Sequence, residues 1–346
     1  MKIGFILPSL ANKGPILVVK ELVGQLKRHD HFCHVFYFTD IVEVEMDCPV
    51  QKIKFTESIE FQSFDIIHTH GLRPDAYVFF HRPYRDITTK FISTVHNYVI
   101  ADFSFQYNRF IAYTCGNIWM ALLCRHTKIV TLSKDAMEYY TKWFSKKKLS
   151  YAYNTRSLEV GNTLSDQERA EILLFKGKDF LIGANTLLTH RKGIDLLIKV
   201  LPRLPQYKLC VVGDGKIKEE LIALAKKYQV GHRCLFAGYK KNASQYLPYY
   251  DIYAMPSRSE GFPLALLEAM IYRKAVVCSD ISVFREILTP REVVFFKLND
   301  DDSLVSAINS AINDKELGER LWGRYQESYA PEKMYERYLA IYNGEI

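Results

Sequence analysis

The sequence contains no apolar run that approaches the roughly 20 residues a membrane-spanning helix needs, which argues against a chain that crosses a bilayer. It also has no CxxC pair, and its seven cysteines lie far apart. An odd number of scattered cysteines is typical of reduced thiols, so we expect a cytoplasmic protein. The first strand-to-helix turn, PSLANKGP, lacks the glycine pattern G-x-G-x-x-G, which argues against a dinucleotide-dependent dehydrogenase.

The length and the charge of the chain further limit the class of protein. The 346 residues are enough for two domains, each with its own core. The formal net charge is +7, and residues 1–155 carry most of it, with 19 basic and 14 acidic residues. A solvated surface, an anionic membrane and a nucleic acid each fit a basic half. No nucleic-acid recognition motif accompanies the charge, so we expect no nucleic-acid partner.

Short apolar runs alternate with helical patterns along the whole chain, which is typical of βαβ units and parallel sheets. The predicted strands cover residues 2–8, 34–38, 65–70, 90–96 and 128–133, and then 180–185, 208–214, 234–239, 251–257, 275–280 and 293–296. The pattern restarts after a polar stretch at 154–170, so we predict two doubly wound α/β domains. Their predicted bounds are 1–155 and 156–330, and a helix within 331–346 is expected to pack back on the first domain.

The segment SRSEGFPLALLEAM, residues 257–270, carries the strongest chemical signal. Glu260 and Gly261 follow a predicted strand, and Pro263 is expected to start a helix whose free N–H groups can bind an anionic group such as phosphate. Glu268 lies within an apolar helix, where a buried carboxylate is costly without a partner. It therefore reaches solvent at an edge or meets hydrogen-bond donors, such as the two hydroxyls of a ribose.

This segment resembles the E-x7-E signature of retaining glycosyltransferase family 4, because Glu260 and Glu268 fall in its register. HRKGIDLLI, VVGDGKIKEEL and FAGYKKNASQYLPYYDIYAMPS in the second half are also similar to this family, as are DIIHTHG, STVHN and VTLSKDAMEYY in the first. The resemblance implies a GT-B fold, in which two Rossmann-like domains face a central cleft. It also implies a nucleotide diphosphate sugar as donor, no cofactor and no metal.

By this resemblance, the donor-binding residues lie in the second domain. Lys192 is expected to hold the diphosphate and Glu260 the donor sugar near its reacting carbon, while Glu268 binds the ribose. Tyr239 stands where the family contacts the base, although a core tyrosine is an equal alternative there. The backbone beneath the sugar and phosphate is expected to come from Gly261, Phe262 and Pro263.

The first domain is expected to contribute His96, in STVHN, close to the transferred sugar. Lys13 and Gly14 occupy the first strand-to-helix loop, where the family places backbone next to the donor phosphate and the acceptor. His68 and His70 are too few to argue a metal site, so we interpret them as structural or cleft-lining residues.

Two positions depart from the family pattern. Leu187 stands where the family has an arginine that grips the diphosphate, and Arg191 or Arg258 is the candidate substitute. Thr155 stands where the family often has glycine after an asparagine, a difference that concerns the linker.

The sequence therefore predicts a retaining, metal-independent enzyme that moves a hexose-type sugar to an acceptor hydroxyl. We expect a glycan or lipid-linked acceptor from bacterial surface polysaccharide synthesis. The aromatic and basic segments 78–91 and 140–153 are expected to dock on the inner face of a membrane. The alternatives are an inactive GT-B scaffold, which Leu187 favours, and a sugar-phosphate epimerase with a similar pair of sheets.

Overall fold

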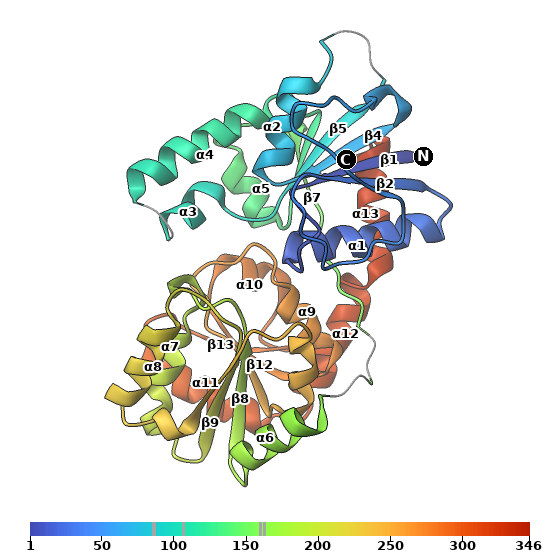
Figure 1. The fold of residues 1–346 in the computed structure, drawn as a ribbon. Helices are drawn as coiled ribbons and strands as arrows, with labels where there is room; N and C mark the ends of the chain where they lie inside the picture. The colour runs from blue at the N-terminus through green and yellow to red at the C-terminus, as the bar shows by residue number, and fades with distance from the viewer. Residues whose placement is uncertain (85–87, 106–107, 159–160, 162–163) are drawn as a thin grey trace. The chain divides into compact units, whose positions relative to one another are not determined.

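A computed structural model describes all residues except 85–87, 106–107, 159–160 and 162–163. The described chain forms two compact units (Figure 1). Unit 1 comprises Met1–Ser157 together with Tyr329–Ile346, and unit 2 comprises Leu158–Ser328. The C-terminal segment thus returns to the unit that contains the N-terminus.

Unit 1 is built on a parallel sheet with the strand order β3-β2-β1-β4-β5-β6-β7. Its strands are β1 (Lys2–Leu7), β2 (Phe32–Tyr37), β3 (Val50–Lys52), β4 (Ile66–His70), β5 (Lys90–Val95), β6 (Lys128–Thr131) and β7 (Leu149–Tyr151). Its helices are α1 (Gly14–Arg28), α2 (Leu72–His81), α3 (Val99–Ser104), α4 (Arg109–Leu123), α5 (Lys134–Tyr140) and α13 (Pro331–Asn343).

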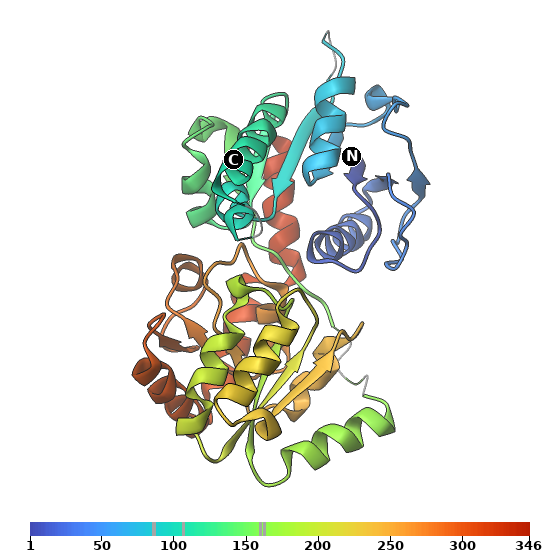
Figure 2. The ribbon, with the colours of Figure 1, turned by 60° about the vertical axis from the view of Figure 1, so that its left-hand side comes forward.

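The terminal helix α13 packs beside α1 in unit 1 (Figure 2). Its apolar stripe is buried, and the ring of Tyr335 stacks on His29 at 3.9 Å between centroids. The chain reaches this helix past Tyr329, whose carbonyl oxygen accepts a 2.6 Å hydrogen bond from Thr155 Oγ1. The hydroxyl of Thr155 therefore ties the start of the linker to the end of the returning chain.

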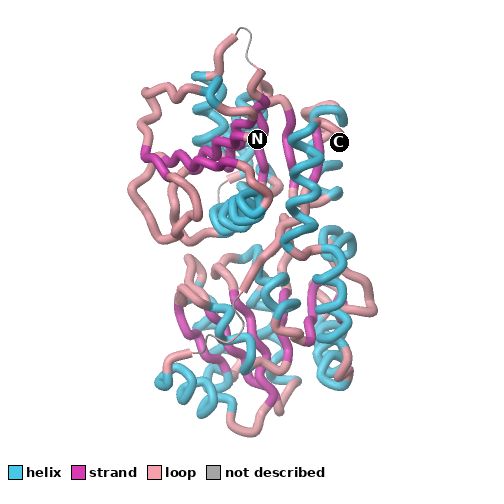
Figure 3. The backbone as a smooth tube through the Cα atoms, turned by 90° about the vertical axis from the view of Figure 1, so that its right-hand side faces the viewer, coloured by secondary structure: helices cyan, strands magenta, loops and turns pink. Residues whose placement is uncertain are grey.

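Unit 2 contains a second parallel sheet, with the order β10-β9-β8-β11-β12-β13. Helices lie on both faces of its strands (Figure 3). The strands are β8 (Phe180–Asn185), β9 (Tyr207–Val212), β10 (Cys234–Gly238), β11 (Ile252–Met255), β12 (Ala275–Ser279) and β13 (Val294–Phe296). The helices are α6 (Asp166–Lys176), α7 (Ile194–Val200), α8 (Lys218–Lys227), α9 (Leu264–Ile271), α10 (Ser282–Ile287), α11 (Asp301–Asn313) and α12 (Leu317–Ser328).

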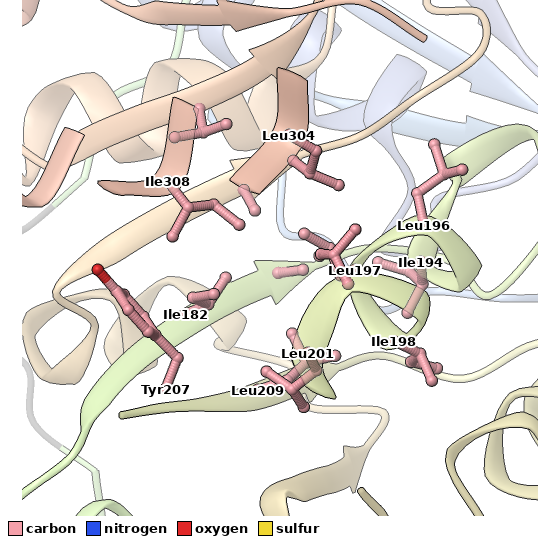
Figure 4. Close-up of a cluster of buried hydrophobic side chains, with 14 of the residues drawn as sticks. Ile182, Ile194, Leu196, Leu197, Ile198, Leu201, Tyr207, Leu209, Leu304 and Ile308 are labelled. Atoms are coloured by element: carbon pink, nitrogen blue, oxygen red, sulfur yellow. The ribbon is translucent and has the colours of Figure 1, made fainter. Parts of the chain in front are cut away.

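The core of unit 2 lies between its sheet and the covering helices (Figure 4). Ile182 and Leu209 of the sheet meet Leu197 of α7 and Ile308 of α11, and all four are at most 2% exposed. Each such side chain contributes about 1.5–3 kcal/mol through removal of its surface from water. This packing fixes the strand ends from which the candidate site projects.

Candidate functional site

The candidate site of unit 2 lies where the strand order of its sheet reverses, at the carboxyl ends of β8 and β11. Ligands bind open α/β sheets at such a point because the connections leave in opposite directions. The two strands pair through Ile182 with Ile252 and Gly183 with Tyr253, and the pairing ends there. Beyond it lies a pocket whose lining includes Asn185, Lys192, Ser257, Glu260, Pro263 and Ala265.

Glu260 is the buried carboxylate of this pocket, with 4% of its surface exposed. Its Oε1 accepts hydrogen bonds from Lys192 Nζ at 2.5 Å and from Ser257 Oγ at 2.6 Å, and Arg191 Nη1 lies 3.4 Å from Oε2. Burial acts to raise the pKa of Glu260, but the charges of Lys192 and Arg191 outweigh it, so the pKa is lowered. A negative charge is therefore held in the pocket at neutral pH.

Lys192 is held by the turn that follows β8. The turn His190–Lys192 ends at Gly193, which has a left-handed φ of 68°. A side chain at Gly193 would place its Cβ 2.0 Å from the carbonyl oxygen of Pro256, after β11. Glycine thus allows the backbones after β8 and β11 to approach closely, and the lysine and the glutamate meet for this reason although 68 residues separate them.

Of the two candidate substitutes for the missing arginine, Arg191 lies beside the pocket carboxylate, with Nη1 3.4 Å from Oε2 of Glu260. Its Nη1 also donates to the carbonyl oxygen of Ser259 at 2.9 Å. Arg258 instead forms a two-pronged ion pair with Asp195, at 2.9 and 2.8 Å. Leu187 is 60% exposed in the loop after β8. Two cations, Lys192 and Arg191, therefore lie beside the carboxylate of Glu260.

Glu268 lies on the less buried face of α9, together with Leu264 and Ala265. The side chain of Glu268 is partly exposed rather than fully buried. Burial and then the negative charge of Glu268 raise the pKa of Tyr253 and of Tyr272, so the carboxylate faces both rings.

The remaining residues of the signature are buried at the start of α9. Gly261, Phe262 and Pro263 are all buried, and Pro263 is the N-cap with φ −77° and ψ 123° rather than the first helical residue. The prediction that Pro263 starts the helix is thus wrong by one position, because its backbone is extended. Tyr239 is 62% exposed, which excludes the alternative of a core tyrosine.

In unit 1, the predicted residues lie at the carboxyl edge of the other sheet. Lys13 is exposed and is the extended N-cap of α1, and Gly14 is that helix's first residue. His96 follows β5 and is partly exposed, and its Nε2 lies 2.8 Å from Nδ1 of His70, the last residue of β4. Among the described residues, no group of three or more His, Cys, Asp or Glu is placed to hold a metal ion.

Sequence reasoning missed two residues that support these groups. Ser257 is 3% exposed and donates to Glu260, and Asp195 holds Arg258. A serine three residues before a glutamate is a signal too common to single out. The Asp195 pair joins residues 63 positions apart, which only the fold brings together.

Comparison with known proteins agrees with this geometry. Residues 165–326 match the family model of glycosyl transferases group 1. The likeness to this family lies in the second half of the chain. The matched segment includes the pocket residues Lys192 and Glu260.

The similarity to glycosyltransferases extends over nearly the whole chain. The O-antigen biosynthesis glycosyltransferase WclY of Escherichia coli is 29% identical over 99% of this chain and 98% of its own length. In Campylobacter jejuni, the N-acetylgalactosamine-N,N'-diacetylbacillosaminyl-diphospho-undecaprenol 4-alpha-N-acetylgalactosaminyltransferase is 30% identical over 55% of this chain and 52% of its own length.

Solved structures confirm the predicted fold class of two Rossmann-like domains of the GT-B type. Sucrose-phosphate synthase from Thermosynechococcus elongatus superposes with a TM-score of 0.81 at 17% identity, over 99% of this chain and 98% of that one. HepE of Anabaena in complex with UDP and glucose gives 0.80 at 16% identity, over 99% of both chains. At such identities the likeness is one of fold.

No helix in the described part of the chain has the length and apolar character needed to cross a membrane.

Proposed function

We propose that the protein is a retaining glycosyltransferase of the E-x7-E type, which moves a hexose-type sugar from a nucleotide diphosphate sugar to an acceptor hydroxyl. The observation that carries this proposal is the arrangement of Lys192, Arg191 and Glu260 at the point where the strand order of the unit 2 sheet reverses. Two cations and a buried carboxylate match a ligand that has both a diphosphate and a sugar whose reacting carbon becomes positive.

Lys192 and Arg191 stabilise the negative charge that grows on the diphosphate as its bond to the sugar breaks. The start of α9 adds to this stabilisation. In this fully described helix, the N-cap Pro263 makes no side-chain hydrogen bond to the first backbone amides, so these N–H groups can bind a phosphate. Glu260 holds the sugar and stabilises its positive character. In a pocket with little water, fixed charges act more strongly than they do in solution.

Glu268 binds the ribose of the donor in this proposal, and Tyr239 contacts the base. The partial exposure of Glu268 supports the assignment, because a ligand can reach a carboxylate that is not fully buried. The backbone of Gly261, Phe262 and Pro263 lies beneath the sugar. His96, Lys13 and Gly14 are the contributions of unit 1. The proposal includes no metal and no resident cofactor.

The names of the relatives support a place in surface polysaccharide synthesis. WclY is an O-antigen biosynthesis glycosyltransferase, and the name of the Campylobacter relative includes a diphospho-undecaprenol substrate. We therefore propose a lipid-linked glycan intermediate as the acceptor, at the inner face of a membrane.

A transfer assay tests the proposed function. The purified protein is incubated with UDP-, GDP- and ADP-sugars and a panel of diphospho-lipid acceptors, without added metal. We expect transfer from one nucleotide class, and the anomeric coupling constant of the product should match that of the donor. Inverted product would contradict the retaining assignment, and nucleotide binding without transfer from any donor would indicate an inactive scaffold.

We infer the membrane-contacting surface of unit 1 from the exposed apolar side chains of α4. Residues 110–124, which form most of this helix, include no charged side chain, and Phe110, Tyr113 and Ile118 are 80%, 65% and 55% exposed. A surface helix normally presents polar residues to water, so an exposed apolar face marks an interaction site.

Basic residues flank this face at both ends. Arg109 is exposed at the first position of α4, and Lys148 Nζ donates to the carbonyl oxygen of Cys124 at 2.6 Å, which places the lysine run 146–148 at the other end. Aromatic residues between basic ones suit an anionic lipid surface, where the rings enter the headgroup layer and the cations meet phosphates. We therefore propose that α4 docks on the membrane.

This assignment corrects part of the sequence-based expectation. In segment 140–153, Trp143 and Phe144 pack in the core of unit 1 and do not form a docking surface. In segment 78–91, Phe80 and Tyr84 are 64% and 92% exposed and remain candidates, while residues 85–87 lie outside the described part. The main exposed apolar face comes instead from α4.

Replacing Phe110 and Ile118 together with serine is expected to weaken binding to anionic vesicles at least about 10-fold, because two apolar side chains no longer enter the lipid. Co-sedimentation with vesicles of phosphatidylglycerol and phosphatidylethanolamine at low salt measures this. Leu174→Ser, at an apolar residue of unit 2 that is 86% exposed, is the matched control. Equal binding by all three proteins, or no binding by any, would contradict the proposed surface.

A further inference from the structure

A row of buried polar side chains runs across β4 and β5 in unit 1 and ends at His96. His68 and His70 alternate with Thr69 and therefore share one face of the sheet. Their exposed fractions are 0% and 1%, and their rings lie 4.4 Å apart between centroids. The ring of His70 also lies 5.1 Å from the ring of His96, between centroids. His70 is therefore the middle histidine of the row, between His68 and His96.

The protein satisfies both nitrogens of His68. Its Nδ1 lies 2.8 Å from the hydroxyl of Tyr342 on α13, and its Nε2 lies 2.8 Å from Oγ1 of Thr94. Thr94 Oγ1 is in turn 3.1 Å from the hydroxyl of Tyr338. The C-terminal helix thus fixes the inner end of the row.

Only one of the two ring nitrogens of His70 has a hydrogen-bond partner in the described chain. Its Nδ1 lies 2.8 Å from Nε2 of His96, whereas its Nε2 is buried and no described residue lies within hydrogen-bonding distance of it. Burial lowers the pKa of His70 far below its usual value and that of His96 to about 3, so both rings are neutral at neutral pH. Each neutral ring has one N–H and one bare nitrogen.

The shared hydrogen bond can therefore be made in two ways. If His96 donates from Nε2, the proton of His70 must stay on its own Nε2, where a buried N–H has no acceptor. If His70 donates from Nδ1, its Nε2 is a bare acceptor instead. Orphaned buried N–H groups are rarer in proteins than unpaired acceptors, so the second arrangement is favoured.

We propose that His70 sets the tautomer of His96: Nδ1–H of His70 donates to Nε2 of His96, and the proton of His96 is held on its Nδ1. His70 is then a positioning residue. The consequence of this tautomer rests on the proposed function: His96 offers the donor sugar an N–H group at Nδ1. In this arrangement His96 donates a hydrogen bond to a sugar oxygen and does not take a proton from one.

The tautomer is read directly from the protein labelled with 15N at histidine, through two-bond correlations between ring nitrogens and carbon-bound protons. We expect His96 to carry its proton on Nδ1 in the wild type. His70→Asn can place its amide nitrogen where Nδ1 stood and should preserve this tautomer. His70→Gln places its amide nitrogen near the Nε2 position, so the Nε2–H tautomer of His96 should appear.

His34→Asn is the matched control, because His34 lies on β2 of the same sheet and its Nε2 is also buried without a partner in the described chain. It should leave the His96 signals unchanged. We expect kcat to fall roughly 10- to 100-fold in His70→Gln and to be largely kept in His70→Asn. A merely structural role would not separate these two variants.

The two readouts separate the failure of this inference from failure of the proposed function. A wild-type His96 protonated on Nε2, or a tautomer that is unchanged in His70→Gln, would overturn the inference whatever the activity. The predicted tautomers combined with unchanged turnover in His70→Gln would support the tautomer assignment and remove His96 from the proposed reaction.

Discussion

Replacing Glu260 with glutamine is expected to lower kcat by about 100- to 1,000-fold while the protein stays folded. Glutamine has the same size and keeps a carbonyl oxygen for Lys192 and Ser257, so the packing of the pocket is preserved. What it removes is a full negative charge. That charge is present in the wild type because Lys192 and Arg191 lower the pKa of Glu260 against the effect of burial.

The same substitution should leave the affinity for the nucleoside diphosphate unchanged or higher. Without the carboxylate, Lys192 and Arg191 have no competing anion and remain available to the phosphates. A large loss in kcat with little change in nucleotide affinity is therefore the expected pattern, since the carboxylate acts on charge that develops in the transition state.

Steady-state kinetics and circular dichroism of Glu260→Gln test this expectation. Glu319→Gln is the control, because Glu319 forms an exposed ion pair with Arg273 at 3.1 Å, and such pairs contribute little. Turnover by Glu260→Gln within a few-fold of the wild type would remove Glu260 from the proposed catalytic role.

Replacing Lys192 with methionine is expected to weaken nucleoside diphosphate binding roughly 10- to 100-fold. Hydrogen bonds to charged groups contribute about 1.5–3 kcal/mol, and each 1.4 kcal/mol is a factor of ten in affinity. The loss should be larger for the diphosphate than for the monophosphate, because the lysine is assigned to the diphosphate. Methionine keeps the length of the side chain, so Gly193 and the turn before it need not move.

Isothermal titration with the mono- and diphosphate of the preferred nucleoside measures this difference. Lys227→Met, at an exposed lysine at the end of α8, is the matched control and should bind as the wild type does. Equal losses for the two nucleotides, or no loss for either, would place the diphosphate away from Lys192.

Much of the fold can be predicted from the sequence. The elements that could not be predicted were missed for physical reasons. Most of the strands are short apolar runs, and their alternation with helices predicts both sheets. The short strands β3 and β7 were missed because three residues carry no periodicity. Helix α4 was missed because residues 110–123 include no charged side chain, so apolar residues stand on its exposed face as well as on its buried face.

The candidate site was predictable where a residue follows a strand and not where it depends on tertiary contact. Glu260 and Lys192 were singled out by the resemblance of their segments to the family, and the switch point of the sheet explains why they meet. The tie between His70 and His96 joins the ends of two strands and depends on ring orientations that no sequence pattern encodes.

The central claim is that the pocket of unit 2 binds a nucleoside diphosphate. It is tested most directly by the melting temperature of the wild-type protein and of Glu268→Ala with UDP, GDP and ADP, without metal. Mass action predicts that one nucleotide at about 100 times its Kd raises the wild-type melting temperature by roughly 5–10 °C, and that Glu268→Ala loses most of this rise. No rise with any nucleotide, at concentrations well above millimolar, would contradict the account.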